Sequence, residues 1–150
     1  ITPVKVYLDN CAIQRPLDDR SQIRIALEAE AIVGVFVFYE LGRIDIVSSE
    51  ALLFEIENNP QISRKEFARE VLKNSESFVS LNEEIESRAK HFQNSGIKPL
   101  AALHLATAEF AKVDFFCTCD DKFLKRALKL DGITLSVVDP IQLIKELEYE

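Results

Sequence analysis

Apolar and polar positions alternate along the chain with two periods, one typical of strands and the other of helices. Five short runs rich in β-branched or aromatic residues predict strands, at Val4–Leu8, Arg43–Ser49, Ser77–Leu81, Asp114–Thr118 and Ile133–Val138. Apolar residues spaced three and four apart predict helices, at Ile23–Leu41, Ala51–Glu57, Ser63–Asn74, between Asn82 and Gly96, at Pro99–Phe110, at Asp121–Lys129 and from Pro140. A polar loop is expected between the first strand and the first helix. This alternation predicts an α/β fold, with a mainly parallel sheet of about five strands covered by helices on both faces.

Several predicted helices carry residues that favour a helix N-terminus. Ser63 and Glu66 have the spacing of a capping box. Asn82, Asp121 and Asp139 stand where an N-cap residue is expected.

The length and charge of the chain limit the function classes. Its 150 residues, 47% of them hydrophobic, predict one domain over residues 1–150. The formal net charge of −7 excludes a broad basic surface, so any contact with nucleic acid must use a local patch. The chain has no uncharged apolar run of about 18 residues and no basic leader, so we expect a cytoplasmic protein that makes no membrane contact. Because methionine is absent, we also expect that Ile1 is not the natural start.

Acidic residues follow three of the predicted strands. Asp9 directly follows the first strand, Glu55 lies in the helix after the second, and Asp120 comes shortly after the fourth. Because ligands of open parallel sheets bind at the carboxyl ends of the strands, we expect these side chains at one edge. Carboxylate oxygens suit Mg²⁺ or Mn²⁺, and such an ion can activate water for attack on a phosphodiester. The alternative is that each acid is an ordinary turn or cap residue.

Ala101 occupies a position that would suit a further acid. The segment Gly96–Phe110 predicts a clear helix start, with a turn glycine and Pro99 at the first helical position. The third helical position favours a carboxylate, because the free N–H groups and the helix dipole point towards it. The chain contains 25 acidic residues, yet none of them stands there.

Four parts of the chain resemble PIN-domain proteins, the VapC-type toxin ribonucleases. They are LDNC (Leu8–Cys11) with RPLDD (Arg15–Asp19), SSEALLFE (Ser48–Glu55), ALHLATAEF (Ala102–Phe110) and DFFCTCDDKFL (Asp114–Leu124). Each motif alone is weak, but together they keep the order and spacing of the family over nearly the whole chain. The resemblance implies a PIN-like three-layer α/β/α sandwich, Mg²⁺- or Mn²⁺-dependent cleavage of RNA, and a cognate antitoxin that blocks the site.

The resemblance also implies a role for individual residues. Asp9, Glu55 and Asp120 match the first, second and last metal-binding acids of the family. The third acid is typically an aspartate directly before ALHLA, where this chain has Ala101. The supporting candidates are Asn10, Thr118 and Asp121. Because alanine favours a helix, we expect the fold to survive while metal affinity and turnover are weakened or lost.

Basic residues near the acids are candidates for contact with RNA. They are Lys122, Lys125, Arg126 and Lys129, which recur at helical spacing after Asp120, and Arg15 in the segment after Asp9. A phosphate backbone that approaches the acids would meet these cations. The alternative is a solvated surface whose charges pair with nearby acids.

Other residues with chemical potential favour structural interpretations. His104 lies three positions after Ala101 in an apolar motif, which predicts a packed and hydrogen-bonded side chain. Cys11, Cys117 and Cys119 lack a paired C-x-x-C spacing, so we expect reduced, small buried side chains rather than a zinc site.

Together these features predict a metal-dependent endoribonuclease, the toxin of a toxin–antitoxin pair, with activity weakened or abolished by Ala101. One alternative is a non-catalytic PIN-like domain that binds RNA or a protein partner. A second is a phosphate-binding or response-regulator-like α/β domain, against which the absence of a glycine-rich loop argues. Because the segment Ile23–Leu41 is more apolar than one face against a sheet requires, we also expect a homodimer.

Overall fold

The chain folds around a parallel sheet, described by a computed structural model over residues 3–148. The main sheet has the order β2-β1-β5-β6 and consists of β1 (Val4–Leu8), β2 (Ile44–Ile46), β5 (Phe115–Cys117) and β6 (Ser136–Val138). A second sheet pairs β3 (Ser48–Ser49) with β4 (Phe78–Val79). All described strand pairs are parallel, which confirms the predicted fold class.

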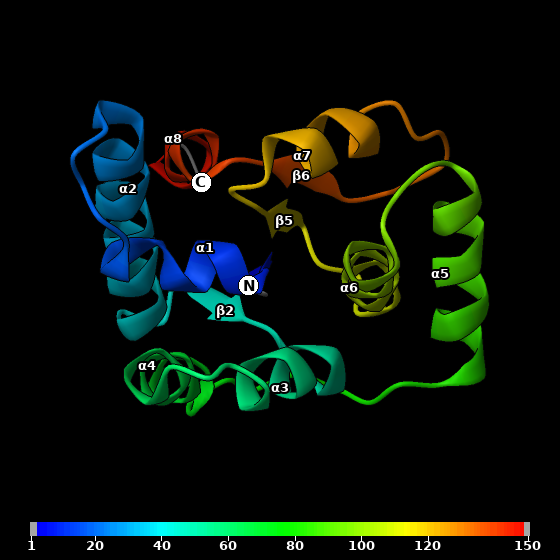
Figure 1. Ribbon diagram of the computed structural model, residues 1–150, viewed down its shortest axis with the longest axis horizontal. Helices are drawn as coiled ribbons and strands as arrows, with labels where there is room; N and C mark the ends of the chain where they lie inside the picture. Colours follow the sequence, from blue (N-terminus) through cyan, green and yellow to red (C-terminus); the bar gives the residue numbers. More distant parts are fainter. Residues whose placement is uncertain (1–2, 149–150) are drawn as a thin grey trace.

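Helices cover both faces of the main sheet. They are α1 (Asn10–Gln14), α2 (Ile23–Glu40), α3 (Glu50–Glu57), α4 (Ile62–Leu72), α5 (Glu83–Asn94), α6 (Pro99–Phe110), α7 (Asp121–Ala127) and α8 (Pro140–Glu148), with a 3-10 turn η1 (Arg15–Leu17). Figure 1 shows α2 and α8 together on one side of the sheet and α5 and α6 on the other. No helix in this part of the chain has the length and apolar character needed to cross a membrane.

The predicted strand Arg43–Ser49 is divided between the two sheets. The N–H of Val47 still donates to the carbonyl of Val6 in β1, at 2.9 Å. The next residue, Ser48, donates instead to Ser77 beside β4, also at 2.9 Å. The chain therefore changes partner at this point, and the five predicted strand regions are shared between two sheets.

Two of the predicted N-caps are confirmed. The side chain of Asn82 accepts from the N–H of Ile85 at 2.8 Å, and that of Asp139 accepts from Gln142 at 2.7 Å.

The other predicted caps are wrong. Helix α4 begins at Ile62, so Ser63 lies inside the helix and not at its cap. Asp120 rather than Asp121 caps α7, because the helix begins one residue earlier than the cap prediction required.

The segment after β1 is a short helix rather than the predicted polar loop. Asp9 is its N-cap, with the side chain accepting from the N–H of Ala12 at 3.1 Å. Ala12 and Ile13 are fully buried, which fixes α1 against the core. The cap therefore holds the Asp9 carboxylate in place directly after the central strand β1.

The core is built on β1, which lies between β2 and β5. Its residues Val6, Tyr7 and Leu8 are fully buried, and the ring of Tyr7 stacks on Phe116 of β5 with a centroid separation of 5.2 Å. Backbone pairing of the two strands continues past their ends, because Asp9 donates to the carbonyl of Cys117 at 3.2 Å. The segments after β1 and β5 consequently lie side by side.

Helix α2 leaves part of its apolar surface exposed. We call its exposed residues Ile23, Leu27, Val33 and Val37 the α2 stripe. Their spacing places them within one face of the helix. The opposite side of α2 buries Ile32 and Val35 in the core, so the stripe is apolar surface that the sheet and α8 do not cover.

Candidate active site

A cavity of about 240 Å³ lies at the carboxyl ends of β1 and β5. Asp9, Glu55 and Asp120 all line it, and so do Ala101 and His104. These residues come from the end of β1, from α3, from the start of α7 and from α6. The structure thus brings the three acids singled out in the sequence to one cavity, which we call the acid-lined cavity, with Ala101 beside them.

The surroundings of Asp9 in the cavity shift the pKa of its carboxyl. Burial raises the pKa of its carboxyl well above the usual value, and the Cys11 thiol adds to the shift. Hydrogen bonds from Thr118 and from the N–H of Ala12 oppose the rise. Within residues 3–148 no lysine or arginine forms an ion pair with Asp9. An ionised Asp9 therefore lacks the cationic partner that a metal ion would supply.

Asp120 is both a cap and a cavity residue. Its Oδ1 accepts from the N–H of Phe123 at 3.1 Å, and its own N–H donates to Oγ1 of Thr118 at 3.0 Å. The cap interpretation and the site interpretation are therefore compatible for this residue. Buried Thr118 bonds to the Asp120 backbone and influences Asp9, so it lies between the two acids.

Glu55 is held by a histidine. Its Oε1 accepts from Nε2 of His104 at 2.8 Å. His104 is only 3% exposed, which agrees with the packed, hydrogen-bonded side chain expected from the sequence. The sequence did not reveal the link from His104 to Glu55, because the two residues lie on different helices.

Ala101 is the third residue of α6 and is half-buried at the edge of the acid-lined cavity. The first turn of α6 contains no acidic residue. Lys98, the N-cap residue of α6, also lines the cavity and brings a cation to its rim. Sequence analysis missed Lys98, although its place directly before Pro99 marks the start of the same helix.

The donor chemistry of the cavity fits a hard divalent cation, but the side chains do not form a tight cluster. Among residues 3–148, no three His, Cys, Asp or Glu side chains converge into a ready-made metal site. Asp9, Glu55 and Asp120 nevertheless line one cavity, and Mg²⁺ commonly keeps several waters beside one or two carboxylates. The residues present therefore suit a partly hydrated ion.

The supporting candidates are placed differently from one another. Asn10 lines the acid-lined cavity, and Thr118 lies directly behind it. Asp121 does not line the cavity, because its carboxylate forms a bidentate ion pair with Arg24 of α2. This ion pair holds the pKa of Asp121 below its usual value.

The basic candidates also divide into two groups. Lys122, Lys125 and Lys129 are exposed on or just after α7, where a nucleic acid can reach them. Arg126 donates to the carbonyl of Gly96 at 3.1 Å and so joins α7 to the turn before α6.

Arg15 is engaged inside the protein. Its guanidinium lies 2.8 Å from Asp18 and 3.2 Å from Glu28, whose residue surface is only 1% exposed. Burial raises the pKa of Glu28 although Arg15 and Arg24 both lie beside it. The positive charge of Arg15 therefore pairs with the buried carboxylate of Glu28.

The expectation of buried cysteines is correct only for Cys117. Cys11 is an exposed residue and Cys119 is half-buried, because both lie in the connections that border the cavity. The Cys11 sulfur is 3.0 Å from Oδ1 of Asp9 and accepts from the N–H of Cys119 at 3.4 Å. The hydrogen bond with the Cys119 thiol, together with partial desolvation by the neighbouring side chains, raises the pKa of Cys11, which favours the protonated thiol.

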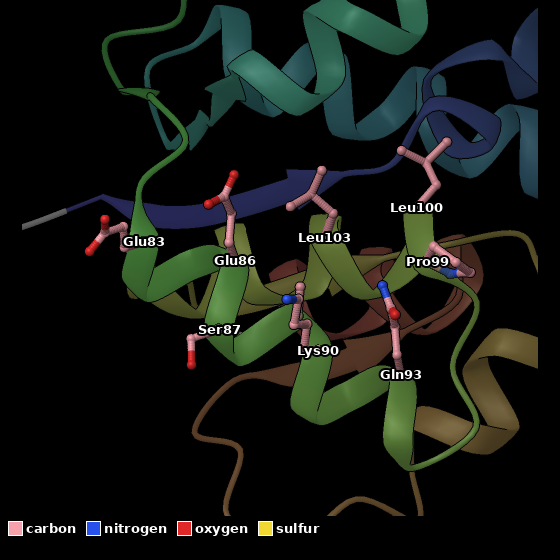
Figure 2. A pocket seen from close by; sticks show the side chains of 9 residues that line it. Glu83, Glu86, Ser87, Lys90, Gln93, Pro99, Leu100 and Leu103 are labelled. Atoms are coloured by element: carbon pink, nitrogen blue, oxygen red, sulfur yellow. The ribbon is translucent and has the colours of Figure 1, made fainter.

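A larger hollow of about 790 Å³ lies between α5 and α6. Figure 2 shows Leu100 and Leu103 on α6 and Lys90 and Gln93 on α5, which all line this hollow. Leu100 also lines the acid-lined cavity, so the two depressions are neighbours. The hollow contains none of the three acids Asp9, Glu55 and Asp120 and is separate from the candidate chemistry.

Comparison with known proteins identifies the family to which this fold belongs. The PIN domain family matches residues 6–129, a range that includes the three acids and Ala101. The chain therefore belongs to the PIN domain family. PIN domains are generally nucleases, which supports a nuclease role with a nucleic acid as substrate.

A solved structure shares the fold at low sequence identity. The crystal structure of PAE2754 from Pyrobaculum aerophilum superposes with a TM-score of 0.54 and 15% identity, covering 99% of this chain and 100% of that one. No curated protein sequence matches the chain.

Proposed function

We propose that the chain is a Mg²⁺- or Mn²⁺-dependent endoribonuclease of the VapC toxin type, weakened or inactive because of Ala101. The observation that supports it is the acid-lined cavity, in which Asp9, Glu55 and Asp120 come together from separate elements beside position 101. The order and spacing of the four PIN-like motifs support the toxin subtype. In this proposal the protein acts in the cytoplasm, its substrate is RNA, and a cognate antitoxin covers the cavity.

In this proposal Asp9, Glu55 and Asp120 hold the divalent ion. The ion, when bound, lowers the pKa of a water molecule and offsets the charge of the attacked phosphodiester. Thr118 fixes the position of Asp120, because its Oγ1 accepts a hydrogen bond from the backbone N–H of Asp120. Asn10 lines the same cavity as a supporting residue. The exposed lysines of α7 attract the RNA backbone, which counters the net charge of −7 locally.

Ala101 itself favours a second candidate function. A PIN-like domain that lacks one acid, and in which residues 3–148 form no tight cluster of ligands, is suited to binding RNA or a protein partner without cleavage. Both candidates use the same surface, so the activity after restoration of the acid distinguishes between them.

The decisive experiment replaces Ala101 by aspartate. Because position 101 borders the cavity, Ala101→Asp adds a carboxylate near Asp9 and Asp120, and it should confer Mn²⁺-dependent cleavage of single-stranded RNA. The double variant Ala101→Asp with Asp9→Asn serves as the control for contaminating nuclease. Absence of cleavage by a folded Ala101→Asp protein would favour the non-catalytic binding domain.

The melting temperature gives an independent readout of the same variant. Without metal, the added carboxylate should lower the melting temperature, because close carboxylates repel one another. With Mn²⁺ the sign should reverse, since an ion that binds only the folded state stabilises it by mass action. If Mn²⁺ changes the melting temperatures of Ala101→Asp and of the unsubstituted protein equally, position 101 does not contribute to metal binding.

A further inference from the structure

A continuous chain of buried hydrogen bonds ends at Glu55. The Tyr7 hydroxyl lies 2.9 Å from Oγ of Ser49 and 2.6 Å from Nδ1 of His104. The other ring nitrogen of His104, Nε2, lies 2.8 Å from Oε1 of Glu55. We call Ser49, Tyr7, His104 and Glu55 the buried relay. It joins the N-cap of α3, the central strand β1, helix α6 and the acid-lined cavity.

The direction of each hydrogen bond follows from the donors available. An ionised Glu55 can only accept, so Nε2 of His104 carries the hydrogen. Nδ1 of a neutral imidazole must then accept, and its donor is the Tyr7 hydroxyl. The Ser49 hydroxyl accepts from the N–H of Leu52 at 3.0 Å and has its own hydrogen to give to the Tyr7 oxygen. Each hydroxyl therefore has a donor and an acceptor, and His104 is fixed in one tautomer.

The surroundings allow the buried relay little freedom. Tyr7 and Ser49 are fully buried, and the ring of Tyr7 lies against Phe116 at an interplanar angle of 14°. Burial also raises the pKa of Tyr7, so its hydroxyl keeps the hydrogen that Nδ1 requires. Because rotation of His104 would leave buried polar atoms without partners, the ring is held in the orientation that points Nε2 at Glu55.

Glu55 is the one member of the buried relay with substantial exposure, 30% of its side chain. Its Oε1 is occupied by His104, whereas Oε2 has no hydrogen-bond partner within residues 3–148. Carboxylates that bind metals are themselves commonly oriented by hydrogen bonds, and loss of such a partner weakens metal binding.

We propose that His104 is a positioning residue, held by Tyr7 and Ser49, that orients Glu55 so that its free oxygen can bind the divalent ion. This role rests on the proposed function, because it assumes that Glu55 is a metal ligand. It assigns no proton transfer to His104. The buried relay instead connects the core of the sheet with the geometry of one ligand in the cavity.

The first test is titration calorimetry with Mn²⁺ on a series of variants. Tyr7→Phe keeps the ring but removes the hydroxyl, and His104→Leu removes both ring nitrogens. Both should weaken Mn²⁺ binding, by about 10- to 100-fold for His104→Leu. His104→Gln should retain most of the affinity, because its amide nitrogen can replace the Nε2 donor.

Thr107→Val is the matched control. Thr107 is a buried residue one turn further along α6, and its hydroxyl donates to the carbonyl of Leu103 at 2.8 Å without touching the buried relay. A general weakening of α6 should therefore affect Thr107→Val and the relay variants alike, whereas a positioning role should leave the control with unchanged Mn²⁺ affinity.

The second test does not require metal. Nitrogen NMR of the unsubstituted protein should show His104 as a single Nε2–H tautomer, with exposed His91, the other histidine of the chain, as an internal reference. In Tyr7→Phe the Nε2–H tautomer should persist, because Glu55 still requires a donor, but the Nδ1 resonance should shift because Nδ1 loses the hydrogen bond from Tyr7. Protonation at Nδ1 in the unsubstituted protein would overturn the proposed direction of the hydrogen bonds and with it the positioning role.

The two proposals fail in different ways. If Tyr7→Phe and His104→Leu bind Mn²⁺ as the unsubstituted protein does while Asp9→Asn does not, the positioning role is wrong and the metal site stands. If Asp9→Asn also binds Mn²⁺ normally, the ion does not occupy the acid-lined cavity, and both the proposed site and the role of His104 are wrong.

Discussion

Asp120 and Asp121 are adjacent in the sequence, yet their carboxylates have different surroundings. Asp120 caps α7 and lines the acid-lined cavity, whereas Asp121 lies outside it and pairs with Arg24 of α2. Successive residues at a helix start point in different directions, so one position is available to a ligand and its neighbour fastens two helices together.

This difference predicts that replacing each aspartate by the uncharged asparagine changes a different property of the protein. Asp120→Asn should keep the N-cap, since asparagine caps as well as aspartate, but should weaken Mn²⁺ binding. Asp121→Asn should leave Mn²⁺ binding unchanged and lose about 0.2–1 kcal/mol of stability, the usual contribution of an exposed ion pair. Calorimetry and urea unfolding measure the two quantities. Equal loss of Mn²⁺ affinity in both variants would contradict the assignment.

The raised pKa of Asp9 predicts that the stability of the metal-free protein depends on pH. Because the folded state holds the Asp9 proton more tightly than the unfolded state, stability falls as the pH rises from the usual aspartate range through the raised pKa. Asparagine cannot ionise and also caps α1. In chelator at neutral pH, Asp9→Asn should therefore melt higher, by about 2–4 °C if the relief is ~1 kcal/mol.

The same substitution should lose its advantage under two conditions. At acidic pH the carboxyl of Asp9 is neutral, so the two melting temperatures should converge. With Mn²⁺ the unsubstituted protein should gain stability and Asp9→Asn should not. A constant difference at all pH values would show that burial of charge at Asp9 is not its cause.

Arg15 and Lys125 are predicted to serve different purposes. Arg15→Ala removes one of the two arginines beside buried Glu28 and should cost about 1–3 kcal/mol of unfolding free energy. Lys125→Ala is exposed and should change stability by less than about 0.5 kcal/mol. It should instead weaken RNA binding and reduce its salt dependence by about one ion, as measured by fluorescence anisotropy. Loss of RNA affinity without loss of stability in Arg15→Ala would reverse this assignment.

The α2 stripe predicts self-association. Its apolar side chains lie on one exposed face, and burial in a homodimer would remove them from water. Light scattering at micromolar concentration should give twice the chain mass of 17.0 kDa, and Val37→Asp should give the monomer without loss of the fold. If the unsubstituted protein scatters as a 17.0 kDa particle, the α2 stripe does not mediate a homodimer.

Local patterns predicted the order of the elements, because strand and helix periodicity depends on neighbouring residues. They did not predict the division of the second strand, since that depends on the pairing of Ser48 with Ser77. Helix α1 was missed because five residues are too few to show a helical period. The N-cap of α7 was predicted at Asp121, one residue after its actual position at Asp120, which is within the usual uncertainty of helix ends.

The candidate site was predictable where it depends on topology. The segments after parallel strands meet at one edge, which brings Asp9 and Asp120 to the same cavity. The hydrogen bond from Tyr7 to His104 joins residues 97 positions apart, so no local sequence pattern can predict it. Likewise, the partner of Arg15 could not be read from the sequence, because Glu28 becomes buried only when α2 packs on η1.

The position of β5 in the sheet also sets when the site can exist during synthesis. Strand β5 pairs with β1 on one side and with β6 on the other, and Asp120 follows β5 directly. A growing chain can pair β1 with β2 early, but the other edge of β1 stays open until β5 has left the ribosome. The acid-lined cavity therefore cannot assemble before β5 and the residues after it have been made, so the candidate site forms later than the pairing of β1 with β2.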